Sequence, residues 1–307
     1  MTKTKFPGSG FGTFWMGPSL SALERVCLLS FVESGYSVTL FSYGGISNVP
    51  LGVAVEDAGL IVPVEMTTRF TVGSKPSLAH FSDYFRYYMI LKRKLIWIDA
   101  DMLFLGNHAG SLERPSIFCK EEQGGINGAI IYTGDVDLLE CLIKGCEEKA
   151  GGKLLWGETG PKLVAKCLQN AGKSVQAYDF QLFYPIEYYD LYKMLLPEFN
   201  AQCEQRCREA ITLHLFNNIL TSMGYWKDIA PPIGSFLHNI FRERNLLQHF
   251  SGVYPENVMR ACLDNFLFRQ NGKALGIRSV LKEMVPSVAR TYRHYTGTVR
   301  RTTNFQS

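Results

Sequence analysis

Leu95-Ile96-Trp97-Ile98-Asp99-Ala100-Asp101 joins four consecutive apolar residues to two carboxylates that are one residue apart. The apolar run, with two isoleucines and a tryptophan, predicts a short buried strand. Open α/β sheets bind ligands outside the carboxyl ends of their strands, which is where Asp99 and Asp101 come. Mg²⁺ and Mn²⁺ prefer such oxygen ligands and keep coordination positions open for substrate phosphates. The stretch predicts an α/β fold with a divalent cation site; the alternative for so short a pattern is a solvated turn.

The segments before this stretch predict strand, helix and strand in that order. Residues 12–16 form the first expected strand, and residues 37–42 alternate as a half-buried strand does. Between them, apolar positions recur at helical spacing, and the helix is expected to end at Ser34-Gly35. Strand, helix and strand in succession open a doubly wound α/β domain.

The later segments continue the α/β pattern. We expect a helix over residues 77–91, strands at 116–119 and 128–132, and helices over 135–149 and from Pro161 to about residue 172. Residues 212–217 are an apolar run that carries an imidazole and an amide, His214 and Asn217. Pro231-Pro232 marks a plausible boundary, which divides the chain into a catalytic domain, 1–230, and a mostly helical basic region, 231–307.

Composition predicts a folded cytoplasmic protein. Of the 307 residues, 46% are hydrophobic, which is ample for a core. The sequence has no apolar run of about 18 residues and no apolar leader at its start. A net charge of +4 without a basic and aromatic stripe argues against a nucleic-acid partner.

The C-terminal segment is locally basic. Residues 278–301 contain six Lys or Arg and one acid, Glu283, interspersed with aliphatic and aromatic residues. Two interpretations stay open: a segment that attaches the protein to the inner face of an anionic membrane, or a solvated helix packed on the body.

The eight cysteines predict buried, reduced thiols. They show no Cys-x-x-Cys pair, and most stand among apolar neighbours. Neither a metal framework nor a disulfide is expected from this spacing.

Seven short motifs are distributed in a defined order and spacing over about the first 220 residues. They are Phe14-Trp15-x-Gly17, Ser82-Asp83-x-x-Arg86-Tyr87, Trp97-Ile98-Asp99-Ala100-Asp101, Ile126-Asn127-Gly128-Ala129, Trp156-Gly157-x-x-Gly160-Pro161-x-Leu163, Phe183-Tyr184-Pro185-Ile186 and His214-x-x-Asn217. Together they resemble the glycosyltransferases of the GT-A fold that carry an Asp-x-Asp motif. The closest resemblance is to the α-1,4-glycosyltransferase group typified by globotriaosylceramide synthase and its mannosyltransferase-like relatives.

The resemblance implies a metal-dependent donor site that uses Mn²⁺ or Mg²⁺. Asp101 would be a direct metal ligand, and Asp99 would bridge ribose hydroxyls and the metal. His214 would supply a further ligand or contact the diphosphate, with Asn217 beside it.

Other residues would hold the donor. Arg86 and Asp83 would bind the donor sugar or phosphate, or else form an internal ion pair. Trp15 and Tyr43, with Gly17 nearby, would enclose the uracil ring; the alternative for both aromatics is the core. The donor-sugar pocket would contain Asn127 and Gly128, whose alternative is a tight turn.

Glu158 is the carboxylate expected on the transfer face, as nucleophile, base or acceptor ligand. The resemblance implies a retaining hexosyltransferase that moves a hexose, expected to be galactose, from a UDP-sugar to a saccharide or glycolipid.

The chain also departs from that group. The usual Gly-Gly-x-Tyr-x-Asp segment is replaced by Lys92-Arg93-Lys94-Leu95-Ile96-Trp97-Ile98, and a membrane anchor and lumenal disulfides are not expected. These departures favour a bacterial enzyme of surface-glycan synthesis that works on the cytoplasmic side. The alternatives are a toxin-like transferase that modifies a protein, and a non-catalytic carbohydrate-binding descendant of the fold.

Overall fold

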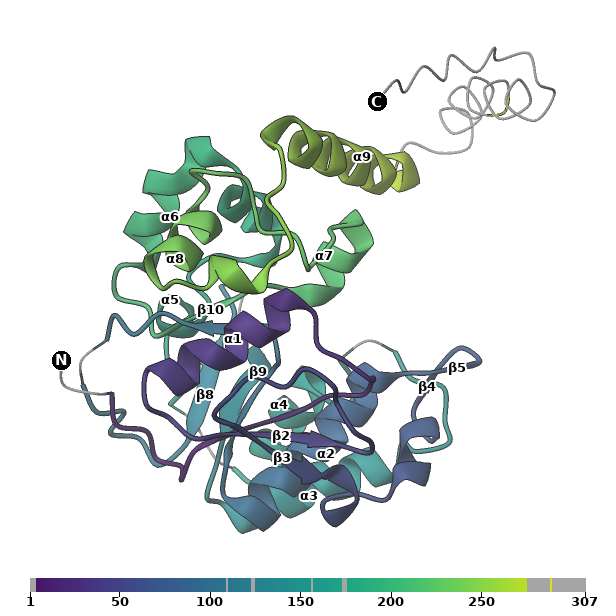
Figure 1. Ribbon diagram of the computed structural model, residues 1–307. Helices are drawn as coiled ribbons and strands as arrows, with labels where there is room; N and C mark the ends of the chain where they lie inside the picture. The colour runs from purple at the N-terminus through teal and green to yellow at the C-terminus, as the bar shows by residue number, and fades with distance from the viewer. Residues whose placement is uncertain are drawn as a thin grey trace.

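The computed structural model describes residues 4–108, 110–122, 125–155, 157–172, 176–274 and 288. Trp156 and nearly all of the basic segment 278–301 lie outside these residues, so the expectations that concern them are not addressed. The described chain forms a mixed α/β body with a largely helical second lobe (Figure 1).

A six-stranded sheet lies at the centre of the first lobe, in the order β3-β2-β1-β6-β9-β8. The first four strands in this order are parallel, and β9 and β8 are antiparallel to their neighbours. Their bounds are Phe11–Phe14 for β1, Val38–Ser42 for β2, Val53–Asp57 for β3, Ile96–Ile98 for β6, Ile117–Lys120 for β8 and Ile126–Tyr132 for β9. The prediction of a buried strand before Asp99 is confirmed, because all three residues of β6 are buried.

The strand order reverses direction at β1. The chain runs from β1 outward through β2 to β3 and then returns to β6 on the other side of β1. In open parallel sheets such a reversal leaves a crevice at the carboxyl ends of the two strands that flank it. Trp15 follows β1 and Asp99 follows β6, so this crevice lies at the residues that the sequence singled out.

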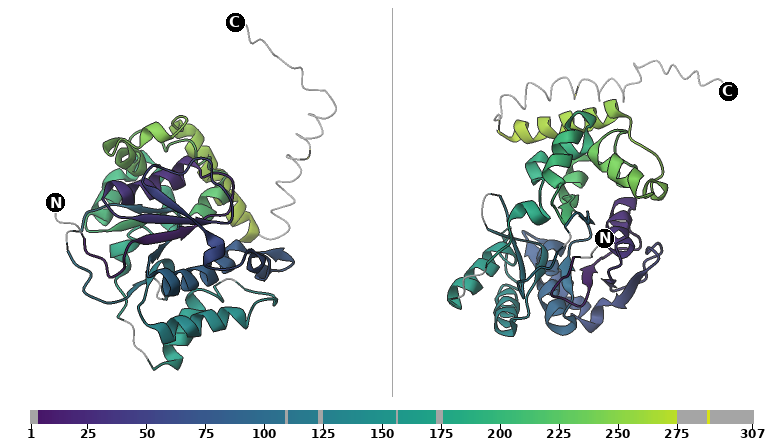
Figure 2. Two further views of the ribbon diagram at one scale, coloured as in Figure 1. Left: turned by 60° about the horizontal axis from the view of Figure 1, so that its bottom comes forward. Right: turned by 90° about the vertical axis from the view of Figure 1, so that its left-hand side faces the viewer.

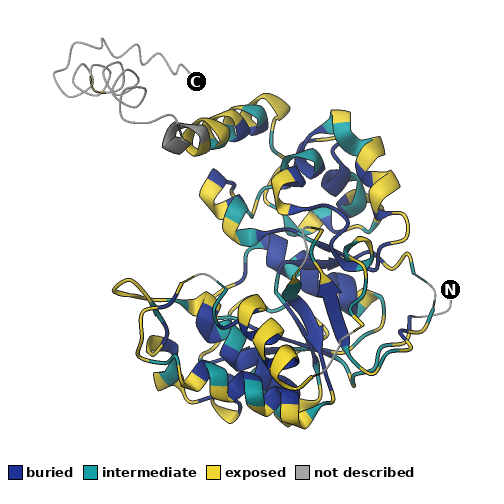
Figure 3. Cartoon of the chain, turned by 180° about the vertical axis from the view of Figure 1, so that it is seen from behind, coloured by how far each residue is buried: buried dark blue, intermediate teal, exposed yellow. Residues whose placement is uncertain are grey.

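Helices cover both faces of the sheet (Figure 2). Helix α1 (Ala22–Glu33) contacts β2 and β3 on one face, whereas α2 (Leu78–Arg93) contacts β1 and β6 on the other. Helix α3 (Val136–Glu147) packs on α2, and α4 (Pro161–Asn170) packs on α3 and β9. Seen from behind, the inner strands of the sheet are largely buried and the outward helix faces are exposed (Figure 3), whereas the edge strand β3 has no buried residue.

The helix starts follow local chemistry. The Asp135 side chain accepts the N–H of Leu138 at 3.1 Å and caps α3. Pro161 begins α4, where its missing N–H costs nothing, so this part of the prediction is confirmed.

A second hydrophobic cluster joins the other face of α1 to the later part of the chain. It extends from Leu23 to Leu263 and contains residues on both sides of Pro231. Its strands β7 (Met102–Phe104) and β10 (Thr212–His214) form an antiparallel pair in which His214 lies opposite Met102. Its helices are α6 (Asn200–Cys207), α7 (Asn217–Met223), α8 (Phe236–Glu243) and α9 (Glu256–Ala274), after the short α5 (Phe180–Phe183).

Smaller elements complete the described chain. They are the hairpin β4 (Thr71–Val72) and β5 (Lys75–Pro76) and the 3-10 turns Ala58–Leu60, Val64–Thr68, Tyr188–Leu195, Pro197–Phe199 and Leu247–His249. Among the described helices, none is both long enough and apolar enough to cross a bilayer.

The expectation that all cysteines are reduced is wrong for two of them. Cys141 in α3 and Cys167 in α4 form a disulfide, with their Cα atoms 6.0 Å apart. The close packing of Gly145 against Leu163 brings the two helices together, and residue spacing does not reveal such a contact. The other six cysteines are free thiols.

Candidate functional site

A cavity of about 810 Å³ opens at the carboxyl ends of β1 and β6, between the sheet and the second lobe. Most of its wall comes from the end of β1, the start of α2, the Trp97–Asp101 turn, the start of β9 and the start of α7. Glu121, Gly157, Pro161, Tyr188 and His214 complete it. The described acids in this lining are Asp83, Asp99, Asp101 and Glu121, and Arg86 is the one Lys or Arg among the described lining residues. The wall is therefore acidic and suits a cation.

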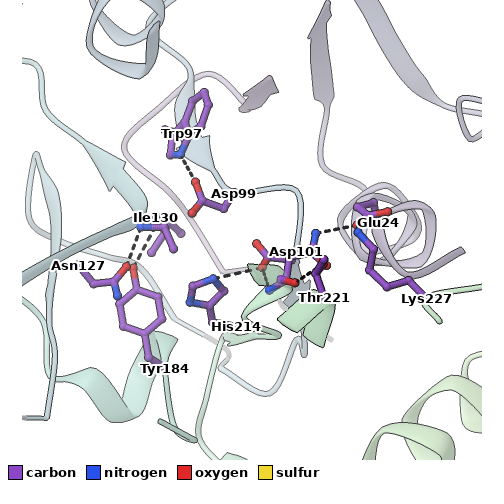
Figure 4. Close-up of polar contacts among 12 residues, drawn as sticks. Glu24, Trp97, Asp99, Asp101, Asn127, Ile130, Tyr184, His214, Thr221 and Lys227 are labelled. Carbon is purple, nitrogen blue, oxygen red and sulfur yellow. Dashed lines mark hydrogen bonds and ion pairs between the residues drawn. The ribbon is translucent and has the colours of Figure 1, made fainter. Parts of the chain in front are cut away.

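Asp99, Asp101 and His214 converge in this cavity and form a group of candidate cation ligands, here called the cation cluster. One ligand atom of each lies within 4.8 Å of the others, and Nε2 of His214 is 3.4 Å from Oδ2 of Asp101. The pairing of β10 with β7 brings His214 to the turn that follows β6, across more than a hundred residues of sequence. Figure 4 shows Asp101 between His214 on one side and the Glu24–Lys227 pair on the other.

Asp101 is held in its ionised form. Burial would raise the pKa of its carboxyl, but the imidazole of His214 and the N–H of Asn217 more than offset this, so the pKa is lowered. The Asn217 N–H donates to Oδ2 at 2.7 Å, and the Leu215 N–H donates to the Asp101 carbonyl at 3.0 Å. The segment from His214 to Asn217 thus wraps around Asp101.

Phe216 completes that wrap in an unusual conformation. Its backbone φ is +50°, in the left-handed region that residues other than glycine rarely adopt, and this conformation costs about 1–2 kcal/mol. The conformation places its ring 4.1 Å from the ring of His214. Strained residues persist where surrounding contacts hold them, and such positions cluster at binding sites.

Asp99, the third member of the cation cluster, contacts Trp97 and Arg86. Its Oδ1 accepts the indole N–H of Trp97 at 2.7 Å and lies 3.4 Å from Nη2 of Arg86. Burial raises the pKa of its carboxyl, and the guanidinium of Arg86 opposes that rise.

Arg86 is buried and held by three partners. It donates to the Gly128 carbonyl at 2.7 Å and pairs with Asp83 at 3.1 Å as well as with Asp99. Asp83 in turn accepts the Thr159 hydroxyl at 2.7 Å. The predicted internal ion pair is therefore present, and both of its members also line the cavity.

The donor set fits a divalent cation. Two carboxylates and one imidazole are ligands that Mn²⁺ accepts, whereas Mg²⁺ prefers oxygen alone. Among the described lining residues, no Lys or Arg other than the paired Arg86 neutralises the negative charge of the carboxylates. Asp99, Asp101 and His214 would hold the ion.

The structure brings together most of the predicted donor residues. Trp15, Asp83, Arg86, Asp99, Asp101, Asn127, Gly128, His214 and Asn217 all line the cavity. Asn127 Nδ2 donates to Glu121 at 3.0 Å, which orients that carboxylate in the wall.

Three predicted residues lie outside the described lining of the cavity. The Tyr43 hydroxyl donates to the Val62 carbonyl at 2.7 Å, and its ring packs edge-on against Phe14, as in the core interpretation. Gly17 follows the lining residue Met16 but does not itself line the cavity. Glu158 turns back to accept the Leu155 N–H at 2.9 Å, so it caps a turn.

Sequence reasoning missed Glu24 and Lys227. Glu24 has no solvent exposure, although it is charged and lies in α1. The pattern Ser21-Ala22-Leu23-Glu24 fits a capping box, which is the one signal that points to this glutamate. The signal does not reveal the contacts with Asn217 and Lys227.

No family model matches the chain, and no curated protein matches it. Among solved structures, the glycosyltransferase PaToxG aligns with a TM-score of 0.40 and 13% identity, over 53% of this chain and 68% of that one. A transferase variant with two Cys-to-Ser substitutions aligns with a TM-score of 0.35 and 15% identity, over 54% of this chain and 87% of that one.

Proposed function

We propose that the chain is a metal-dependent glycosyltransferase of the GT-A type that transfers a hexose from a UDP-sugar to a saccharide or glycolipid. The observation that carries this proposal is the Asp99, Asp101 and His214 cluster at the strand-order reversal, inside an acidic cavity of about 810 Å³. A cavity of this volume suits a ligand of nucleotide-sugar size.

The diphosphate would bind at the cation cluster. Arg86 already faces Asp83 and Asp99, so the described lining offers no uncommitted Lys or Arg for phosphate charge. A bound divalent cation would neutralise the charge that develops on the leaving diphosphate. Activity is therefore expected to depend fully on the metal.

The base and sugar would lie on either side of this cluster. Trp15 follows β1 at the cavity, where its ring can stack on uracil, and its indole N–H is fixed on the Ser19 carbonyl at 3.0 Å. Asn127, Gly128 and the Asp83–Arg86 pair would surround the sugar. We leave Tyr43, Gly17 and Glu158 out of the proposed donor site because of their placement.

Glu121 is the carboxylate we assign to the acceptor side. It lines the cavity, is oriented by Asn127, and has no described Lys or Arg pairing in this wall. A carboxylate there can accept a hydrogen bond from the incoming hydroxyl. Galactose as the sugar and retention of configuration rest on the resemblance alone.

The organisation and location of the protein are also proposals. Every described lining residue falls at or before Ile219, which supports residues 1–230 as the catalytic unit. Exposed Leu267 and Phe268 near the end of α9, followed by the basic segment 278–301, support peripheral attachment to a cytoplasmic membrane face.

The test is a panel of UDP-, GDP- and CMP-sugars incubated with Mn²⁺ or with chelator, with released nucleotide as the signal. We expect turnover of one UDP-sugar that chelator abolishes, and an Asp101→Asn variant that is folded and at least 100-fold slower. Absence of nucleotide release and of binding for every donor would refute the proposal.

A further inference from the structure

Glu24 has more partners than helix capping requires. Its Oε2 accepts the Ser21 N–H at 2.8 Å and the Ser21 hydroxyl, which completes the capping box. Its Oε1 accepts the side-chain amide of Asn217 at 2.6 Å and the ammonium of Lys227. A fully buried carboxylate is costly unless it is paired, and a capping glutamate works equally well at the surface. The burial therefore points to a second role.

Asn217 connects Glu24 to the cation cluster. Its side-chain amide is bound by Glu24, and its main-chain N–H donates to Asp101 Oδ2 at 2.7 Å. Fixing the side chain of Asn217 thus fixes the direction of the N–H that holds Asp101. A single residue, Asn217, therefore links the carboxylate of Glu24 to the carboxylate of Asp101.

The same anchor holds the strained turn. Phe216 lies between His214, which is fixed in β10, and Asn217, which is fixed on Glu24. With both ends held, Phe216 stays in the left-handed region and keeps its ring against His214. If Asn217 lost its anchor, the turn would be free to relax, and the imidazole would lose the ring that orients it.

Lys227 pairs with the buried carboxylate of Glu24 and connects it to Trp15. Its ammonium pairs with Glu24, and its carbonyl accepts the Leu23 N–H at 3.2 Å. The ammonium also lies 5.8 Å from the ring centre of Trp15. The ion pair between Glu24 and Lys227 therefore lies next to both ends of the proposed donor site.

We propose that Glu24 is a positioning residue of the cation site: through Asn217 it orients Asp101 and the His214–Phe216 turn as ligands. The proposal rests on the proposed function for the presence of the cation. Residues that orient metal ligands from outside typically change metal affinity by about 10- to 100-fold when they are replaced. A merely structural Glu24 would change stability and leave the affinity of the folded protein alone.

The experiment measures the Mn²⁺ dissociation constant by electron paramagnetic resonance, together with circular dichroism, for the wild type and four variants. Glu24→Gln removes the charge at constant shape, and Asn217→Ala removes the anchored amide while keeping the main-chain N–H. The double variant tests whether the two act in series. Glu33→Gln is the matched control, because Glu33 is an exposed glutamate at the other end of α1.

We expect Glu24→Gln and Asn217→Ala each to weaken Mn²⁺ binding by about 10- to 100-fold at an unchanged folded fraction. The double variant should be no weaker than the worse single variant, because both break one link. Glu33→Gln should match the wild type. If Glu24→Gln does not fold, Asn217→Ala decides.

Two outcomes overturn the proposal in distinguishable ways. A wild type that binds Mn²⁺, with folded Glu24→Gln and Asn217→Ala variants that bind it equally well, refutes the positioning role and leaves the proposed function standing. A wild type that does not bind Mn²⁺, alone or with UDP, refutes the cation site itself and the positioning role with it.

Discussion

Gly128→Ala is predicted to disrupt the site through a single methyl group. A Cβ at Gly128 would lie 2.1 Å from Nη1 of Arg86, whereas ordinary contact begins at 3.4 Å. The nitrogen must therefore retreat by about 1.3 Å, from 2.1 to 3.4 Å. Gly128 itself does not have a positive φ, so the effect is one of space alone.

The retreat has a calculable cost because Arg86 is held on several sides. Its guanidinium bonds the Gly128 carbonyl at 2.7 Å and Asp83 at 3.1 Å, and its side chain is 8% exposed. Breaking one partner of a buried ion pair costs about 3–5 kcal/mol. We expect Gly128→Ala to lower the free energy of unfolding by about 3 kcal/mol and the melting temperature by roughly 5 °C.

Urea unfolding and donor binding measure the effect. The matched control is Gly134→Ala, since a Cβ at Gly134, just beyond β9, meets nothing within 4 Å. The control should be within about 1 kcal/mol of the wild type. A Gly128→Ala protein that unfolds at the wild-type urea concentration and binds UDP-sugar equally well would show that Arg86 is not clamped as described.

Three further predictions concern other parts of the molecule. Burial, helped by Arg242, lowers the pKa of His238 below its usual 6.5. The unfolded chain therefore binds this proton more readily, so stability should fall as pH drops through 6.5 towards the folded pKa, and His238→Asn should flatten that part of a urea-midpoint-against-pH curve. Replacing Cys141 and Cys167 by Ser together should cost about 3 kcal/mol, given their sequence separation of 26, and a reductant should shift the wild-type melting temperature equally; no shift would mean that the bridge is absent in solution. Glu121→Gln should slow transfer at least tenfold while Glu158→Gln stays near wild type, and the reverse order in a steady-state transfer assay would restore Glu158 to the transfer face.

Local patterns were sufficient for three of the four parallel strands, β1, β2 and β6, and for Asp99 and Asp101, whereas the half-exposed β3 was not predicted. The apolar run before Asp99 and the strand-helix-strand opening are both encoded within a few neighbouring residues. The position of Asp99 and Asp101 beside Trp15 also follows from the sequence, because the parallel strands β1 and β6 bring their carboxyl ends to one edge of the sheet.

Contacts between distant segments were not accessible in the same way. Asp83 and Arg86 are visibly one helical turn apart, but the Gly128 carbonyl and the Thr159 hydroxyl that complete their network come from other elements. His214 reaches Asp101 through the antiparallel register of β10 on β7, which no single segment encodes.

Tyr43 and Glu158 show why residue type at a plausible position is not enough. Tyr43 follows a strand, as Trp15 does, but its ring turns into the core against Phe14. Glu158 lies in the expected glycine-punctuated loop, but its carboxylate is used by the N–H of Leu155. In both cases a hydrogen bond to the main chain, to the Val62 carbonyl for Tyr43 and from the Leu155 N–H for Glu158, decides the direction of the side chain.

A crystal structure of the protein with Mn²⁺ and UDP tests the central claim most directly. We predict an anomalous manganese peak among Asp99, Asp101 and His214, with the diphosphate on the ion and the uracil ring against Trp15. A peak at another place, or UDP bound outside this cavity, would contradict the account.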